Sequence, residues 1–207
     1  MKIKSVVFDL DGVLVNSLDV MEISWNSVKE KYSVNQSFHS YAKYIGLPFL
    51  EILKKIGIEE NQDDIRNDYF GFARKNINKI EQYKDSSKIF QILNNNGIAT
   101  GIITSKNSKN TNLICKKFEL FADEIITPDD VIKGKPNKDS GLEYLKRTGF
   151  KSNEVLYVGD METDYIFSKN MGFNFLFANY GYAHNKSNQY DTIDNLMDII
   201  NKLRIIQ

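Results

Sequence analysis

The stretch Ser5-Val6-Val7-Phe8-Asp9-Leu10-Asp11-Gly12-Val13-Leu14-Val15 decides how the whole chain is interpreted. Its apolar run predicts a short strand that is buried on both faces of a parallel sheet. The run ends in two carboxylates, Asp9 and Asp11, followed by Gly12, which allows a sharp turn. Because an unpaired buried carboxylate is costly, this ending favours a metal-assisted nucleophile site. An Asx-rich turn after an edge strand is the alternative.

The overall composition limits the classes of protein that the chain can represent. It has 207 residues, 27 basic and 27 acidic side chains, and a formal net charge of zero. We expect one domain, with or without an insertion, and no nucleic-acid binding, which needs a clustered basic surface. A membrane span is not expected either, because no apolar run is long enough to cross a bilayer. A secretory signal is not expected, because Asp9 and Asp11 interrupt the N-terminal apolar segment. The lone Cys115 cannot form an intramolecular disulfide, so we expect a cytoplasmic protein.

From residue 84 onward, predicted helices alternate with short predicted strands. The strands are expected at 98–103, 124–127, 155–158 and 174–177. The helices are expected at 86–95, 110–118, 138–148 and 163–171, followed by a closing helix that contains Ile193, Leu196, Met197, Ile200 and Leu203. Residues 16–83 show helical patterns at 18–32, 49–56 and 63–80, with Ser17 as the expected N-cap of the first. No strand other than the first is expected before residue 98.

This order of elements predicts an α/β fold. The expected core is Rossmann-like, with a parallel sheet between two layers of helices. It comprises residues 1–15 and 84–207. Residues 16–83 are expected to form an all-helical cap that is inserted after the first strand.

Polar side chains follow several of the predicted strands. Because the carboxyl ends of parallel strands share one edge of the sheet, we expect these side chains to converge although they are far apart in the sequence. A cluster of carboxylates needs a cation, and oxygen ligands suggest Mg²⁺. Hydroxyl groups and a lysine beside such a cation indicate a phosphate site. The side chains are Asp9, Asp11, Thr104, Ser105, Lys135, Asp160 and Asp164.

The same residues resemble the four ordered motifs of the haloacid dehalogenase-like superfamily. The matching segments are Asp9-Leu10-Asp11-Gly12, the strand-ending Thr104, Lys135-Pro136, and Gly159-Asp160-Met161-Glu162-Thr163-Asp164. The resemblance covers essentially the whole chain, including the helical cap. It points to the phosphoglycolate phosphatase-like and beta-phosphoglucomutase-like subgroup.

The resemblance implies a role for each of these residues. Asp9 would be the nucleophile and a Mg²⁺ ligand. Asp11 would be the general acid and then the general base, and would offer its backbone carbonyl to the metal. Asp160 would bind Mg²⁺, and Asp164 would complete or orient the coordination shell.

The remaining motif residues would act on the phosphate. Thr104 would bind a phosphoryl oxygen, and Ser105 would donate its backbone N–H. Lys135 would neutralise the phosphate and hold Asp9 in place. Lys43, Tyr44, Phe49 and Arg74 are candidates for substrate specificity by their location in the cap alone.

Phosphate-ester hydrolysis through an aspartyl-phosphate is the reaction that the resemblance favours. Dehalogenases lack an acid at the position of Asp11, and sugar-phosphate mutases usually have a histidine where this chain has Met21. We therefore expect a Mg²⁺-dependent phosphatase that acts on a small phosphate monoester, such as a sugar phosphate or phosphoglycolate. A mutase of the beta-phosphoglucomutase type and a catalytically idle binding protein are the alternatives. The oligomeric state, monomer or homodimer, is left open.

Overall fold

The computed structural model describes residues 2–183 and 190–203. Its main feature is a six-stranded parallel sheet with the strand order β5-β4-β1-β6-β7-β8. The strands are β1 (Ser5–Phe8), β4 (Ala99–Ile103), β5 (Glu124–Ile126), β6 (Val155–Gly159), β7 (Asn174–Ala178) and β8 (Thr192–Ile193). The first strand lies near the middle of the sheet and pairs in register with β4 and β6.

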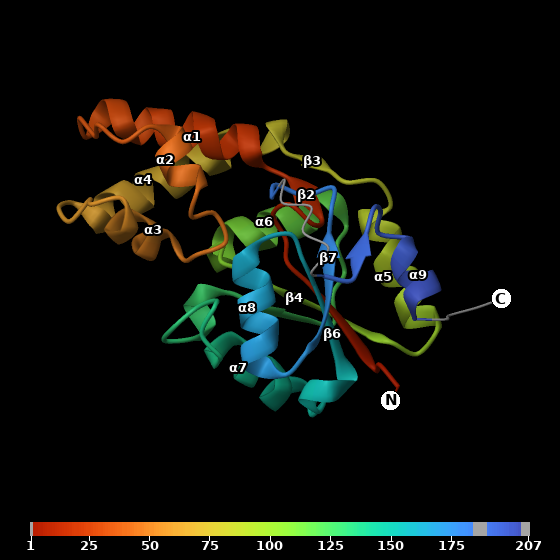
Figure 1. Ribbon diagram of the computed structural model, residues 1–207. Coiled ribbons are helices and arrows are strands. Elements are labelled where there is room, and N and C mark those ends of the chain that lie inside the picture. Colours follow the sequence, from red (N-terminus) through yellow and green to blue (C-terminus); the bar gives the residue numbers. More distant parts are fainter. Residues whose placement is uncertain (1, 184–189, 204–207) are drawn as a thin grey trace.

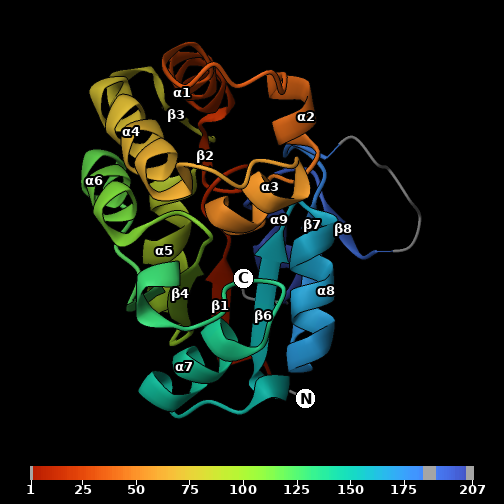
Figure 2. The same cartoon turned by 90° about the vertical axis from the view of Figure 1, so that its left-hand side faces the viewer.

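Helices cover both faces of this sheet, as Figures 1 and 2 show. Val6 and Phe8 of β1 pack in a cluster with residues of α5 (Ser86–Asn95), α6 (Ser108–Phe118) and α9 (Asp198–Lys202). Val7 points the other way and packs with residues of α7 (Asp139–Thr148) and α8 (Glu162–Met171). All four residues of β1 are buried, as expected for a strand between two helical layers. The predicted α/β Rossmann-like fold is therefore confirmed.

The segment between β1 and α5 is mostly helical and lies beyond the carboxyl ends of the central strands (Figure 1). It contains α1 (Leu18–Lys31), α2 (Phe38–Ala42), α3 (Phe49–Lys55), α4 (Gln62–Lys75) and a 3₁₀ turn at Ile77–Lys79. These helices have a hydrophobic cluster of their own, with Trp25 and Leu53 fully buried at its centre. We refer to α1–α4 as the helical lobe.

Two short strands join the helical lobe to the sheet domain. Strands β2 (Val15–Asn16) and β3 (Glu81–Gln82) pair antiparallel. The two segments in which the chain passes between the sheet domain and the helical lobe therefore lie side by side. The prediction of no strand in this region was therefore wrong. Strand β3 has no apolar periodicity that could predict it, because both of its residues are polar and exposed.

Several other boundaries differ from the sequence-based expectations. The helix expected at 63–80 ends at Lys75, and the five-residue helix α2 was not expected. Ile193 belongs to β8, so the closing helix is shorter than predicted. Ser17 does not cap α1 with its side chain, because its hydroxyl donates to Asp11 instead. In the described residues, no helix is long and apolar enough to span a membrane.

Candidate active site

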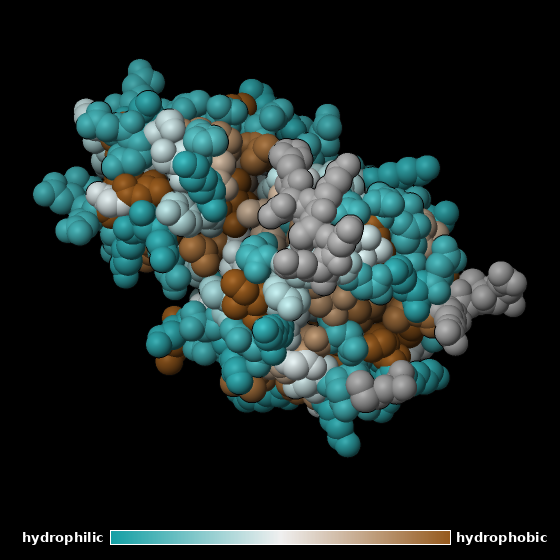
Figure 3. Space-filling model, in the orientation of Figure 1, coloured by the Kyte–Doolittle hydropathy of each residue, from teal (hydrophilic) through white to brown (hydrophobic). Residues whose placement is uncertain are grey.

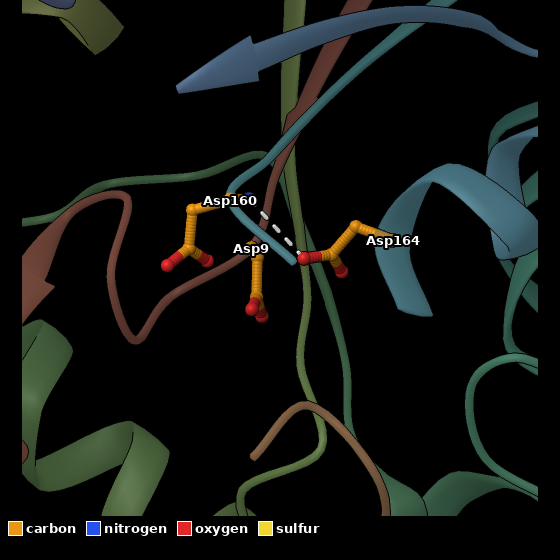
Figure 4. Close-up of side chains that lie close together, drawn as sticks. All are labelled: Asp9, Asp160 and Asp164. Carbon is orange, nitrogen blue, oxygen red and sulfur yellow. Dashed lines mark hydrogen bonds between the residues drawn. The ribbon is translucent and has the colours of Figure 1, made fainter. Parts of the chain in front are cut away.

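Three carboxylates meet at the carboxyl ends of β1 and β6. One oxygen from each of Asp9, Asp160 and Asp164 lies within 4.8 Å of the others, and all three residues are buried. Figure 4 shows Asp9 and Asp160 at the ends of neighbouring strands, with Asp164 reaching in from the start of α8. The convergence expected from the parallel sheet is thus present in the structure.

Gly12 permits this close arrangement. Its φ angle is +85°, and a Cβ atom built on it would lie 2.1 Å from Oδ2 of Asp160. Any side chain here would be strained and would also push the Asp160 carboxylate away. Oδ2 of Asp160 accepts a 2.6 Å hydrogen bond from the backbone N–H of Tyr182, which fixes the carboxylate from the opposite side.

Lys135 lies between two of the carboxylates. Its Nζ is 2.7 Å from Oδ1 of Asp164 and 3.0 Å from Oδ1 of Asp9, and its side chain is fully buried. Nζ also donates to the hydroxyl of Tyr157 at 2.8 Å, and that hydroxyl donates to the carbonyl of Ile103. Burial opposes the charge of Lys135, but the neighbouring Asp164 and Asp9 carboxylates outweigh it and raise the pKa of the ammonium.

Burial has the opposite consequence for the acids. It raises the pKa of Asp9 to about 7, although the ammonium of Lys135 partly offsets the effect. Burial also raises the pKa of Asp160 well above its ordinary value, and the charge of Asp164 adds to this. Among the described residues, Oδ1 of Asp160 is a buried oxygen that accepts no hydrogen bond, and Oδ1 of Asp9 has the ammonium of Lys135 as its polar neighbour. Such oxygens are expected where a bound cation completes the site.

Asp164 differs from the other two acids in its contacts. Its Oδ2 accepts from the backbone N–H groups of Asp160 and Met161, at 3.2 and 3.1 Å. Its Oδ1 accepts from Lys135, and the hydroxyl of Tyr157, whose single proton is shared between this oxygen and the carbonyl of Ile103, lies 3.2 Å away. Both oxygens are therefore held by protein donors, and the carboxylate in turn fixes the start of α8 and the position of Lys135.

Asp11 lies apart from the carboxylate cluster. Strand β1 ends at Phe8, and the Asp11 carboxylate accepts from the hydroxyl of Ser17 and forms a 3.1 Å ion pair with Lys106. The side chain of Lys106 is only 8% exposed. Lys106 was not predicted as a site residue, although its position two residues after Thr104 could have indicated it.

A small cavity of about 50 Å³ lies above Asp9 and Asp11. Thr104, Ser105 and Lys106 line its sheet side, whereas Met21, Tyr41 and Phe49 are among the side chains that line it from the helical lobe. Such a volume has room for only a few water-sized groups. Lys135, Asp160 and Asp164 do not line this cavity, so they lie behind Asp9 as seen from the open space.

The loop after β4 connects the two parts of the molecule. Oγ1 of Thr104 accepts from the backbone N–H of Lys106, and the hydroxyl of Ser105 donates to the carbonyl of Gly46 at 2.7 Å. The Ser105 side chain therefore contacts the helical lobe. Of the cap candidates, Phe49 lines the cavity, whereas Lys43 and Tyr44 do not.

Comparison with known proteins identifies the family. A family model described as haloacid dehalogenase-like hydrolase matches residues 6–178. The chain belongs to this family. The match confirms the family predicted from the four motifs and places the chain among hydrolases.

Curated relatives and solved structures agree with this assignment. The chain is 30% identical over 180 residues to pyrophosphatase PpaX of Bacillus cereus, which covers 83% of this chain and 81% of the relative. A hydrolase from Pseudomonas syringae has a TM-score of 0.88 at 21% identity, over 98% of this chain and 99% of that one. A predicted phosphoglycolate phosphatase from Haemophilus somnus has a TM-score of 0.85 at 21% identity, over 98% of each chain. At these identities the two structures support the fold alone.

Proposed function

We propose that the protein is a Mg²⁺-dependent phosphatase that uses Asp9 as its nucleophile. The observation that supports this most strongly is the position of Asp9. It lines a small cavity, and it lies close to a buried lysine and to a carboxylate oxygen of Asp160 that accepts no hydrogen bond from the described residues. A nucleophile, a fixed positive charge and carboxylate oxygens of the kind that bind a metal are thus gathered at one point.

The residues present suit a hard divalent cation. Asp9 and Asp160 would hold Mg²⁺ through carboxylate oxygens, together with the backbone carbonyl of Asp11. Because both oxygens of Asp164 are already engaged, Asp164 would orient the site more than it would bind the ion directly. When bound, the cation would neutralise negative charge on the phosphoryl group.

The protein's own side chains account for the two halves of the reaction. An oxygen of Asp9 would attack phosphorus, while Asp11 gives a proton to the leaving oxygen as its bond to phosphorus breaks. Thr104 and the backbone N–H of Ser105 would bind the phosphoryl oxygens. Water would then attack the phosphorus of the aspartyl-phosphate and lose its proton to Asp11, so that Asp9 is released as a carboxylate. Lys135 would hold Asp9 in place throughout.

Two substrate classes deserve comparison. A small phosphate monoester follows from the resemblance to phosphoglycolate phosphatase-like proteins, and pyrophosphate follows from the name of the PpaX relatives. Both would place a phosphoryl group over Asp9. We retain the monoester as the first candidate, because Asp11 can protonate an alkoxide leaving group, which needs a proton more than phosphate does.

A mutase is disfavoured by the cavity lining. Met21 lines the catalytic cavity from α1, so the position at which such mutases usually carry a histidine offers no titratable group.

We further propose that residues 16–83 act as a cap that moves about the paired strands β2 and β3 and excludes water during transfer. The protein would work in the cytoplasm, on a small phosphorylated metabolite.

The experiment that tests this proposal is phosphate release from p-nitrophenyl phosphate and from a panel of phosphate esters and pyrophosphate, with Mg²⁺ and with a chelator. Native protein should release phosphate only with the metal. Asp9→Asn should be folded by circular dichroism and inactive. Activity that survives in the chelator, or in pure Asp9→Asn, would contradict the proposal.

A further inference from the structure

An open cleft adjoins the catalytic cavity at the boundary between the helical lobe and the sheet domain. Its volume is about 710 Å³, within the range of about 300–1,000 Å³ that is typical of small-molecule sites. One wall comes from α3 and α4, and the other from the loops around residues 105–109 and 128–134. Figure 2 shows α3 and α4 above the start of α6 and the segment before α7. In Figure 3 the outline of the molecule narrows at the boundary between the two parts.

The cleft continues directly from the catalytic cavity. Phe49, Phe70 and Ser105 line both spaces, and the two rings have centroids 5.4 Å apart. The catalytic cavity has room for little more than a phosphoryl group. A group attached to a phosphoryl group over Asp9 would therefore need further space, and the cleft beyond Phe49 and Phe70 is the space that adjoins the cavity.

The cleft is positively charged, although the protein as a whole is neutral. Its lining includes five basic side chains and only two acidic ones. The basic residues are Lys54, Arg66, Arg74, Lys109 and Lys133, and the acidic residues are Glu51 and Asp129.

Several of these basic groups have no acidic partner. Arg66 forms an ion pair with Asp63 at 3.1 Å. By contrast, within residues 2–183 and 190–203 no ion pair involves Arg74, Lys109 or Lys133. Arg74 is half-buried, and within the described part of the chain its guanidinium donates to one side chain, the neutral amide of Asn110, at 3.0 Å. A half-buried, unneutralised arginine in a ligand-sized cleft is well suited to bind an anion.

We infer that this cleft binds an anionic part of the leaving group, with Arg74 as the main contact and Lys109 and Lys133 on the opposite wall. The preferred substrate would be an organic phosphate with a second negatively charged group, a carboxylate or a second phosphate. The inference rests on the proposed phosphatase function and adds the chemical class of the substrate. The volume of the cleft favours an organic leaving group over the compact phosphate that pyrophosphate would release.

The test compares two matched pairs of esters. Glycerol 3-phosphate ends in a neutral hydroxymethyl group where 3-phosphoglycerate has a carboxylate, and fructose 1-phosphate has a hydroxyl group where fructose 1,6-bisphosphate has its second phosphate. Native enzyme should show a higher kcat/KM for the charged member of each pair, and the preference should weaken at high salt. Arg74→Gln, which keeps a donor for Asn110, should reduce the charged-to-uncharged ratio about tenfold, because a charge-assisted hydrogen bond is lost.

Further variants separate binding from structural effects. Arg74→Lys should retain part of the ratio, and Lys109→Gln with Lys133→Gln should lower it. Lys75→Gln is the matched control, because Lys75 is the exposed neighbour of Arg74 on α4 and does not line the cleft. An equal fall for both members of a pair would assign Arg74 a structural role and overturn the inference.

The outcome also distinguishes this inference from the proposed function. Hydrolysis of p-nitrophenyl phosphate without discrimination within either pair would overturn the inference alone. A pyrophosphatase rate that exceeds every ester rate and is unaffected by Arg74→Gln would also overturn it. No hydrolysis of any of these compounds would instead contradict the proposed function.

Discussion

The buried ammonium of Lys135 gives the most quantitative prediction. Lys135→Met removes the positive charge between Asp9 and Asp164 and leaves a side chain of similar length in a fully buried position. Both carboxylates then face each other without a cation in the metal-free protein. We expect the variant to fold but to be markedly less stable than the native protein.

The size of the loss follows from the burial. Removing one partner of a buried ion pair typically costs about 3–5 kcal/mol, because the remaining charge is left uncompensated. For a protein of this size each kcal/mol lowers the unfolding temperature by roughly 2–4 °C. The expected fall is therefore about 6–20 °C. Mg²⁺ should recover part of it, since it restores a positive charge beside Asp9.

The assay is urea and thermal unfolding at about pH 8 in the presence of a chelator. Lys138→Met is the matched control, because Lys138 is exposed and lies in the same segment. Lys135→Met combined with Asp164→Asn should be more stable than Lys135→Met alone, because the second carboxylate charge is gone. A loss below about 1 kcal/mol for Lys135→Met, the scale of a surface ion pair, would refute this account of Lys135.

Three further predictions concern the same site. Burial raises the pKa of Asp9 from 3.8 to about 7, so the folded metal-free protein binds the carboxyl proton more tightly than the unfolded chain does. The stability that Asp9 contributes should therefore be full below about pH 4 and should be lost as the pH rises through about 7. Asp9→Asn should remove this part of the pH dependence in thermal unfolding with chelator, and an unchanged profile would contradict the assignment. Gly12→Ala should raise the Mg²⁺ concentration needed for half-maximal activity, because its Cβ would displace the Asp160 carboxylate; a normal Mg²⁺ titration would be evidence against Asp160 as a ligand. Lys106→Met should lower kcat/KM about tenfold for alkyl phosphates. The loss should be smaller for p-nitrophenyl phosphate, because its leaving group needs no proton from Asp11. Equal losses for both kinds of substrate would contradict a link between Lys106 and proton transfer.

Much of the fold could be predicted because its elements have strong local signals. Strand β1 is a continuous apolar run, and the alternation of helices and strands after residue 84 specifies a parallel sheet. The elements that were missed are short and depend on tertiary contacts. Strand β3 is two exposed polar residues that pair only because Val15 and Asn16 lie beside them, and such pairing leaves no periodicity in the sequence.

The site likewise contains residues that could be predicted from local sequence signals and residues that only the tertiary structure reveals. Asp9, Thr104 and Asp160 were predictable because each follows a strand of one parallel sheet. Tyr157 and Lys106 were not predicted. Tyr157 has the pattern of a core residue, and only the structure shows that its hydroxyl contacts Lys135 and Asp164.

The central claim is that phosphoryl transfer passes through Asp9. Its most direct test is to quench native enzyme with acid during turnover, reduce the protein with borohydride, and locate the modified residue by peptide mass spectrometry. Because borohydride converts an aspartyl-phosphate to homoserine, the account predicts homoserine at position 9 in the presence of substrate and Mg²⁺. Homoserine at another aspartate, or rapid turnover with no modified aspartate in samples where a known aspartyl-phosphate enzyme is trapped, would contradict it.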